Sequence, residues 1–341
     1  MKKHILSLSF ASTLSFGFGL DSLSSIASNI GDSIGNINFN NDSSSISVDN
    51  QCQKQFENYD FNWSGILKVA SLYGISNSEK IIGFLNNKSD SKQITSDDFK
   101  KFAKLVAKNY LWIPLEVEKI YGEEIYKNRV QGGDVILRNT KNSKYKKLYK
   151  KVDSFIAEFN KYTKQLENSY PYEIKVYILS TEKTAEAAPY GYVFISEDYV
   201  KNDTYKTILS HEMAHISKRH TTKEIQYRMV NMYDSITEVT SLIKKMQDID
   251  MGSKFAYGYA GREVIKKSFE AYSQEQEIEA DACGLKTLNS ILPNKKQKII
   301  QEFIKNIKEG YHYKENDLNK FSEHPDKEIR IDNIQKLATH L

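Results

Sequence analysis

The alternation of apolar and polar residues predicts a mainly helical chain. In its first third, three helix-like runs are separated by Gly, Asn and Ser residues, and they span 63–74, 78–87 and 96–112. The last run opens on Ser96, a suitable N-cap, and continues with an apolar stripe at helical spacing, Phe99, Phe102 and Val106. We therefore predict a helical N-terminal region over 52–113, which either covers the rest of the protein or handles a substrate or partner.

The sequence after Pro114 combines helices with a few strands. The stretch 115–130 starts the predicted catalytic domain, and a long amphipathic helix is predicted over 144–168, with apolar positions at Leu148, Val152, Phe155, Ile156 and Phe159. The segment 173–180 then alternates as a strand does, and the apolar run 192–196 follows a Pro-Tyr-Gly turn and predicts a second strand. The expected fold class is α+β, with helices in the majority and a small β-sheet.

The stretch 207–220, TILSHEMAHISKRH, contains the spacing His-Glu-x-x-His within a predicted helix. Four residues make a little over one helical turn, so His211 and His215 project from the same face and can bind one metal ion. Glu212 lies beside them and suits a general base that takes a proton from water activated by zinc. Apolar neighbours place this helix in a core, where two histidines require partners. The pattern predicts a zinc peptidase.

Two downstream glutamates, Glu238 and Glu277, compete for the place of the third metal ligand. One helical turn after Glu277 stands Asp281, which can accept a hydrogen bond from the second ring nitrogen of a ligand histidine. Leu242 occupies the equivalent position after Glu238. Small residues near Glu277 also allow its helix to approach the histidine helix closely, namely Ala280, Ala282 and Gly284. We predict Glu277 as the ligand and Asp281 as the acid that orients a histidine.

The pattern does not fit the metzincin class of zinc peptidases, because Lys218 and Thr221 stand where that class has a glycine and a third histidine. Four motifs instead resemble the gluzincin family that contains HtpX, the CAAX prenyl proteases and the Oma-type mitochondrial proteases. They cover 120–341 and comprise TAEAAPYGYVFIS, HEMAH with His220, the EIEAD box and EHPDKEIRI. The chain departs from the family at Thr184 and Tyr190, where the family has an asparagine and a glycine, which leaves the geometry of this loop open.

This resemblance implies one zinc ion per chain, with ligands and catalytic base as predicted above and with Asp281 behind the ligands. It also implies a zincin-type domain whose small sheet borders the active-site cleft. The strand 192–196 would form the edge of that sheet, where an extended polypeptide could add by main-chain hydrogen bonds. An ordinary paired strand is the alternative for this segment.

The segment between the two metal-binding helices has two parts. Residues 225–247 are predicted to be helical. Residues 252–261 contain three glycines and are predicted to be pliable, either as a lid over the substrate or as a plain surface loop.

The C-terminal motif EHPDKEIR holds two further candidates, His324 and Arg330. Pro325 favours a turn before a new helix, and the simplest interpretation is a helix start with Arg330 paired to a surface acid. In the family that the chain resembles, this motif folds back over the zinc. By resemblance, His324 and Arg330 are candidate catalytic residues that donate hydrogen bonds to the oxyanion formed during peptide hydrolysis. His324 could instead occupy the open zinc position and hold the protease latent.

The first residues have the features of a secretory signal peptide over 1–27. Two lysines precede a serine-diluted apolar stretch that is shorter than a membrane span, and cleavage after Ala27 follows the small-residue rule. An uncleaved anchor and cleavage near Gly19 are the alternatives. Residues 28–51 are rich in Ser, Asn, Asp and Gly and predict a flexible leader. We therefore expect export to the periplasm.

The chain has two cysteines, Cys52 and Cys283. In an oxidising compartment they could form a disulfide between the end of the leader and the helix of the third ligand. The sequence does not show whether they approach each other, so a buried Cys283 with an unbonded Cys52 stays open.

Composition limits the classes of partner. Hydrophobic residues make up 40% of the chain, which is enough for the core of a peptidase domain over 114–341. The net charge of +4 arises from lysines interleaved with acids, and nucleic-acid binding is not expected without a basic face and stacking aromatics. No apolar stretch after the signal peptide could span a bilayer, so membrane association is at most peripheral. The oligomeric state is unknown.

The predicted function is a zinc-dependent endopeptidase that hydrolyses polypeptides, with misfolded envelope proteins as the substrates that the resemblance implies. A zinc-binding chaperone-like or assembly factor with little proteolysis is the alternative, although zinc binding alone does not need Glu212 as a base. A peptidase for short peptides is a second rival, and it would differ in whether the cleft is open at both ends.

Overall fold

The computed structural model describes residues 52, 96–109, 111–165, 170–181, 184–202, 204–233, 235–260, 272, 274–309 and 327–341. These residues belong to one compact unit, Val48–Leu341. The predicted signal peptide, the predicted leader and the predicted helices over 63–74 and 78–87 lie outside the described residues.

The described strands form a mixed four-stranded sheet in the order β1-β2-β4-β3. Their bounds are β1 (Val135–Ile136), β2 (Lys175–Leu179), β3 (Ala185–Ala188) and β4 (Tyr192–Ser196). Strand β4 runs parallel to β2 and antiparallel to β3, so that Val193 pairs with Val176 on one side and with Ala187 on the other. Strand β3 therefore forms one edge of the sheet, and β1, antiparallel to β2, forms the other.

The prediction that residues 192–196 form the edge strand is wrong, because β4 lies between β2 and β3. All five residues of β4 are buried. A strand that is covered on both faces has a continuous apolar sequence, which is what YVFIS shows. The edge strand beside β4 is Ala185–Ala188, whose alanines have little strand propensity and gave no separate signal.

Side chains alternate between two hydrophobic cores on opposite faces of the sheet. Val176 and Val193 point into the first core, while Tyr177 and Phe194 point into the second. The first core is formed with α7 (Ser143–Thr163), α8 (Glu197–Lys201), α9 (Tyr205–Ser217), α14 (Gln274–Ile291), α15 (Lys296–Glu309) and α16 (Lys327–Ala338). A short 3-10 helix, η2 (Pro293–Lys295), leads into α15.

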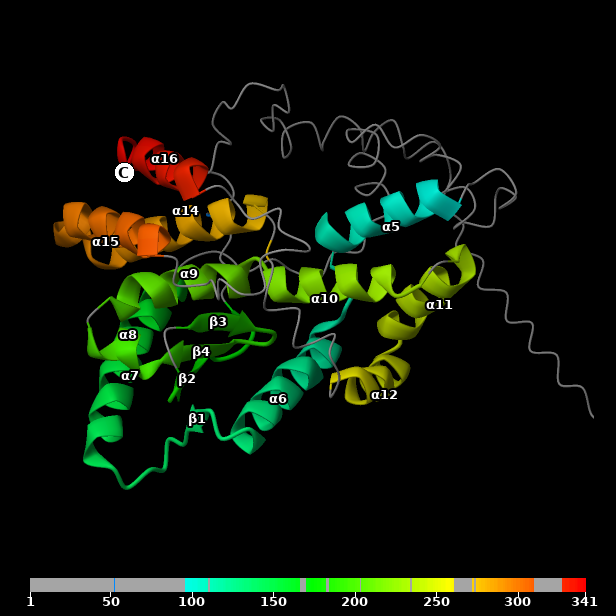
Figure 1. Cartoon of the computed structure of the whole chain (residues 1–341), viewed down its shortest axis with the longest axis horizontal. Helices are drawn as coiled ribbons and strands as arrows, with labels where there is room; N and C mark the ends of the chain where they lie inside the picture. Colours follow the sequence, from blue (N-terminus) through cyan, green and yellow to red (C-terminus); the bar gives the residue numbers. More distant parts are fainter. Residues whose placement is uncertain are drawn as a thin grey trace, which may run out of the picture. The chain divides into compact units, whose positions relative to one another are not determined.

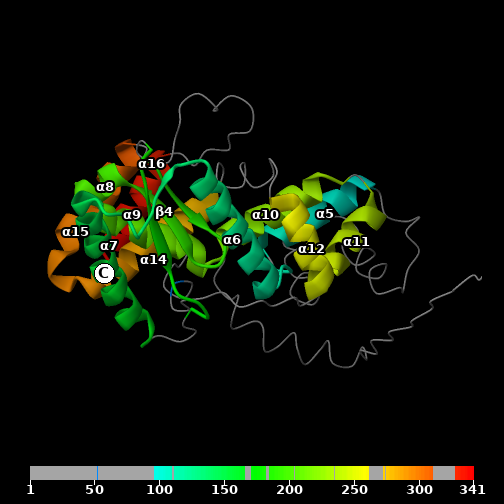
Figure 2. The same ribbon diagram turned by 90° about the horizontal axis from the view of Figure 1, so that it is seen from below.

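The second core is formed with five helices of the described part of the chain, α5 (Ser96–Asn109), α6 (Leu115–Gln131), α10 (His220–Asn231), α11 (Ile236–Gln247) and α12 (Ile249–Ala260). Figures 1 and 2 show α5, α10, α11 and α12 grouped together. The mainly helical α+β class is thus confirmed. None of the helices described in this structure is long and apolar enough to cross a membrane.

The helix predicted over 225–247 is interrupted between α10 and α11. Ser235 is the N-cap of α11 and forms a capping box with Glu238, in which each side chain bonds to the backbone N–H of the other. Glu238, the rejected metal-ligand candidate, therefore has a structural role at the start of a helix.

Residues 252–260 of the segment predicted as pliable belong to the helix α12, so the surface loop is wrong there, while the lid stays a prediction. A Cβ added to Gly252 would lie 2.9 Å from the carbonyl oxygen of Met246 and 3.0 Å from the side chain of Val117. The glycine therefore permits close packing of α12 against α6. The sequence analysis interpreted Gly252 as a sign of flexibility, whereas the structure requires a glycine there for close packing.

The N-terminal region makes buried hydrogen bonds to the helix that follows the histidine motif. The side-chain oxygen of Gln226 in α10 accepts the backbone N–H groups of Trp112 and Ile113 at 2.8 and 3.0 Å. The amide nitrogen of Gln226 donates to the carbonyl of Ala107 in α5 at 3.0 Å. These contacts agree with a helical cover, while the domain boundary at residue 114 stays a prediction.

Candidate active site

Helix α9 carries the His-Glu-x-x-His residues into the protein interior. His211, Glu212 and His215 are each 0% exposed. Apolar residues on the other faces of α9, such as Ile208 and Met213, lie in the first core and fix the rotation of the helix. The Nε2 atoms of His211 and His215 are 2.9 Å apart, so both rings converge on one point.

Helix α14 supplies the third side chain. It lies against α9 (Figure 1), and a Cβ added to Gly284 would lie 3.0 Å from the backbone nitrogen and Cα of His211. Glu277 reaches both histidines: its Oε2 is 3.6 Å from Nε2 of His211 and its Oε1 is 3.5 Å from Nε2 of His215. Glu238, by contrast, is exposed on α11.

The chemistry and spacing of these groups fit a zinc ion. One ligand atom from each of His211, His215 and Glu277 lies within 4.8 Å of the others. Ligand atoms that surround one zinc ion tetrahedrally at about 2.0–2.2 Å are about 3.4 Å apart, close to the distances between Glu277 and the histidines. Two imidazoles and one carboxylate are also a donor set of catalytic zinc sites, which keep one position open.

Asp281 holds the outer side of His211. Its Oδ1 is 2.8 Å from Nδ1 of His211, and Arg330 of α16 donates to its two oxygens from Nε at 2.6 Å and from Nη2 at 2.8 Å. Nη1 of Arg330 also lies 2.8 Å from Oε2 of Glu277. These contacts favour a positioning role for Arg330 over the predicted role of oxyanion donor. His324 lies outside the described residues.

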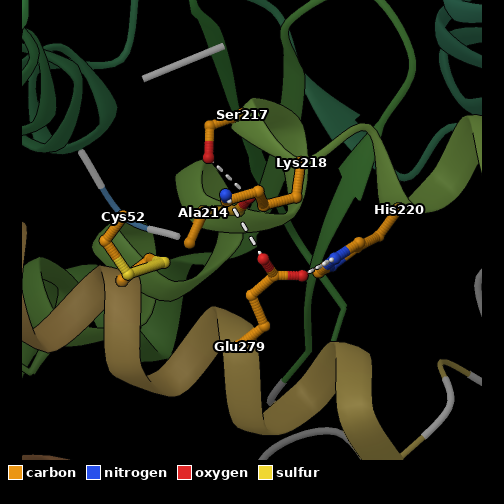
Figure 3. Close-up of a disulfide and its surroundings, with 7 residues drawn as sticks. Cys52, Ala214, Ser217, Lys218, His220 and Glu279 are labelled. Carbon is orange, nitrogen blue, oxygen red and sulfur yellow. Dashed lines mark hydrogen bonds and ion pairs between the residues drawn. A yellow bond between two sulfur atoms is a disulfide. The ribbon is translucent and has the colours of Figure 1, made fainter. Parts of the chain in front are cut away.

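His215 has a longer chain of support, which sequence reasoning did not find. Its Nδ1 is 2.8 Å from Nδ1 of His220, and Nε2 of His220 is 3.0 Å from Oε2 of Glu279. Nζ of Lys218 lies 3.2 Å from the other oxygen of Glu279 (Figure 3). If Nε2 of His215 directs its lone pair at a metal ion, the ring proton of His215 is on Nδ1. His215 then donates to His220, and His220 donates to Glu279.

The EIEAD box thus supplies three acids to one site. Glu277 faces the histidines, Asp281 supports His211 directly, and Glu279 supports His215 through His220. Residues two apart on a helix do not face each other, which is why the sequence alone did not group Glu279 with Glu277.

Charge and burial act in opposite directions on the acids of α14. Burial alone would raise the pKa of Glu277, but the charge of Arg330 and a hydrogen bond with His215 outweigh it and hold this pKa well below its ordinary value. Burial would also raise the pKa of Asp281, but the charge of Arg330 and a hydrogen bond with His211 outweigh it and lower this pKa. Burial also lowers the pKa of His215 well below its ordinary value. The supporting acids are therefore charged and His215 is neutral at pH 7, the states that metal binding requires.

Glu212 has the opposite electrostatic character. Burial raises the pKa of Glu212 well above its ordinary value, and the charge of Glu277 adds to this, while a hydrogen bond with the backbone of Ala187 opposes it. A carboxylate with a raised pKa is a better proton acceptor near neutral pH. Ala187 lies on the edge strand β3, so the sheet borders the site as the resemblance implied.

Tyr272 completes the surroundings of His215. Its ring stacks on the imidazole, with the centroids 3.9 Å apart and an angle of 17° between the planes. Its hydroxyl oxygen is 2.7 Å from Oγ1 of Thr221 and donates to the carbonyl of Ala187 at 3.2 Å. Sequence reasoning missed this residue because nothing separated it from the other 21 of the 22 tyrosines.

A disulfide joins Cys52 to Cys283 of α14 across 231 residues of sequence. The two cysteines form a small hydrophobic cluster with Ala214, which precedes His215 in the sequence (Figure 3). The structure therefore answers the question that the sequence left open, and it places the covalent link beside the candidate metal site.

The model of peptidase family M48 matches residues 150–338, more than half of the chain. The match includes α9, α14 and α16 and therefore every described residue of the candidate metal site. A comparison with curated proteins finds no match. The chain belongs to peptidase family M48, which confirms the predicted family and identifies the protein as a metallopeptidase.

Proposed function

We propose that this member of peptidase family M48 is a zinc-dependent endopeptidase that acts on polypeptides outside the cytoplasm. The observation that carries the proposal is the convergence of His211, His215 and Glu277 on one point, with the buried Glu212 beside them. These groups supply the two things that peptide hydrolysis by this route needs, a set of metal ligands and a proton acceptor.

His211, His215 and Glu277 would hold the ion. Zinc, when bound, supplies a Lewis acid that lowers the pKa of water and polarises a carbonyl group. Asp281 and His220 each lie 2.8 Å from Nδ1 of one of the two histidines, where they would accept the Nδ1 protons and keep both Nε2 lone pairs directed into the site.

Glu212 is the proposed general base. It takes a proton from the attacking water and returns it to the nitrogen of the leaving amine, so one carboxyl group serves both steps. Its raised pKa and its complete burial support this role, because a group that must accept and release a proton works best with a pKa near the working pH.

His324 is proposed to reach this site from the segment before α16. If His324 donates to the oxyanion, His324→Ala should lower kcat by roughly 10²- to 10³-fold without loss of zinc. If His324 is a latency ligand, the same variant should show raised basal cleavage of casein. Casein turnover and zinc content of His324→Ala separate the two roles, and values equal to wild type in both measurements would reject both of them.

The proposed location is the bacterial periplasm, after removal of residues 1–27. The disulfide supports this location, because such bonds persist in oxidising compartments and are rare in the cytosol. The proposed substrates are misassembled or misfolded envelope proteins, as the resemblance to HtpX- and Oma-type proteases suggests. Mass spectrometry of the native protein tests export: a chain that starts near Ser28 is expected, and a retained Met1 would contradict the proposal.

The function is tested by casein digestion together with metal analysis of the purified chain. We expect about one zinc per chain, cleavage of casein, loss of cleavage with a chelator and its return with added zinc. Zinc binding without cleavage of any denatured protein would instead favour the chaperone-like alternative.

A further inference from the structure

Two non-glycine residues in the described part of the chain have a positive φ angle, Tyr190 at 61° and Arg219 at 52°. A left-handed conformation is unfavourable for both residue types, because Cβ approaches the backbone carbonyl. Such residues persist only where neighbouring groups hold them, and they concentrate at functional sites. Each of these two residues lies at a turn that leads into the candidate active site.

Both left-handed residues bind the same side chain, Glu118 of α6. The Oε1 atom of Glu118 accepts the backbone N–H of Tyr190 at 3.0 Å. The Oε2 atom accepts Nε of Arg219 at 2.7 Å and also Nη2 of the same guanidinium. Glu118 and Arg219 are 1% and 2% exposed, so this ion pair is almost fully withdrawn from water.

The turn at Arg219 positions the second metal-binding histidine. Arg219 separates the end of α9 from the start of α10, and the next residue, His220, bonds to Nδ1 of His215 at 2.8 Å. A change in the conformation of Arg219 would rotate the start of α10 and move His220 away from His215.

The turn at Tyr190 positions the edge strand. It joins β3 to β4, and β3, which contains Ala187, lies against α9, the helix that carries Glu212. The carbonyl of Ala187 also accepts the hydroxyl of Thr221 at 2.7 Å, which ties the strand to α10. The left-handed backbone at Tyr190 therefore affects the placement of the catalytic base.

We propose that Glu118 is a positioning residue of the peptidase, which holds the two left-handed turns and thereby sets the geometry of both His215 and Glu212. This inference rests on the proposed zinc-dependent function. It gives the N-terminal region a part in the active site, because Nη2 of Arg219 also donates to the carbonyl of Ile113 at 3.0 Å.

The test compares full-length Glu118→Gln with Glu116→Gln, the same change at an exposed position two residues earlier in α6. Glutamine keeps the size of the side chain, but its NH₂ group cannot accept the hydrogen bonds of Arg219. We expect Glu118→Gln to weaken the affinity of the metal-free chain for zinc about tenfold or more, measured by competition with a chelator, and to lower kcat for casein. Glu116→Gln should match wild type in both measurements.

A rescue experiment separates positioning from general stability. Glycine adopts positive φ without strain, so the triple variant Glu118→Gln, Tyr190→Gly, Arg219→Gly removes the need for the carboxylate and the buried charge that depends on it. We expect this variant to recover zinc affinity and kcat towards wild type. A purely structural ion pair predicts equal recovery in the matched triple variant Glu118→Gln, Tyr190→Ala, Arg219→Ala, which removes the same buried charge but does not relieve the left-handed backbone.

Each outcome decides the proposal. Equal zinc affinity in Glu118→Gln and Glu116→Gln would overturn it, as would a glycine triple variant that is unfolded by circular dichroism or folded with weakened affinity. If Glu118→Gln alone does not fold, recovery of zinc affinity and kcat in the glycine triple variant supports the positioning role of Glu118. Wild-type protein that neither binds zinc nor cleaves casein would refute the proposed function instead, so the two failures are distinguishable.

Discussion

Glu212 combines complete burial with a second carboxylate close by, and this combination has a measurable cost in the metal-free chain. Its pKa is raised by burial and by Glu277 above the unfolded value of about 4.3. A carboxyl group of this kind contributes its full stability below the unfolded pKa and loses it as the pH rises through the folded pKa. The ionised form of Glu212 therefore opposes folding at neutral pH.

Metal-free Glu212→Gln should consequently be more stable than metal-free wild type at pH 7. Because the folded pKa of Glu212 lies above its unfolded pKa, we expect a measurable gain in the free energy of unfolding at pH 7. The gain should disappear near pH 4, where wild-type Glu212 is protonated. Denaturant unfolding of both chains across this pH range checks the expectation, and equal stability at pH 7 would contradict the assigned environment.

Asp281 acts on the metal through His211, and its removal should weaken zinc binding rather than abolish it. We expect Asp281→Ala to lower zinc affinity by roughly 10- to 100-fold. Asp250→Ala, at an exposed position of α12, is the matched control and should leave the affinity unchanged. An unaltered affinity in Asp281→Ala would make Asp281 a purely structural partner of Arg330.

Residue-scale prediction succeeded where a helix period alone sets the geometry. The four-residue spacing brings His211 and His215 to one face, and the same spacing places Asp281 one turn after Glu277. Prediction failed for Tyr272, because Tyr272 and His215 are 57 residues apart in sequence (272 minus 215) and no local pattern encodes a contact over that distance.

At the scale of elements, the site depends on the close approach of α9 and α14. We expect Gly284→Ala to weaken zinc affinity as well as stability, because the added methyl group would meet the backbone of His211. Gly252→Ala introduces a similarly tight contact between α12 and α6, away from the metal ligands, and should lower stability alone. Thermal unfolding and chelator competition on both variants distinguish the two effects, and unchanged zinc affinity in Gly284→Ala would show that α14 can retreat without loss of the site.

Helices and strands with a strong period of apolar residues were predictable from the sequence. Those whose conformation depends on packing against other elements were not. The stripe on α7 identified that helix, and the pattern of β2 identified that strand. Strand β3 consists largely of alanine and is a strand only because β4 pairs with it. Helix α12 contains glycines that favour a loop in isolation, but its packing against α6 overrides that preference.

At the scale of the whole molecule, the disulfide ties Cys52 to the helix of the third ligand. We expect the double variant Cys52→Ser, Cys283→Ser to lose about 2–5 kcal/mol of stability against denaturant, since the bond closes a very long loop. The mass of the wild-type protein before and after reduction verifies the bond itself. Equal stability of variant and wild type would mean that the bond constrains neither the folded nor the unfolded chain.

The most direct test of the central claim is zinc content and casein turnover of Glu212→Gln beside wild type. The claim assigns metal binding to His211, His215 and Glu277 and proton transfer to Glu212, so it predicts about one zinc per chain in both proteins and cleavage in wild type only. Glu277→Ala should lose zinc and cleavage together. A Glu212→Gln chain that retains zinc and still cleaves casein at the wild-type rate would contradict the account.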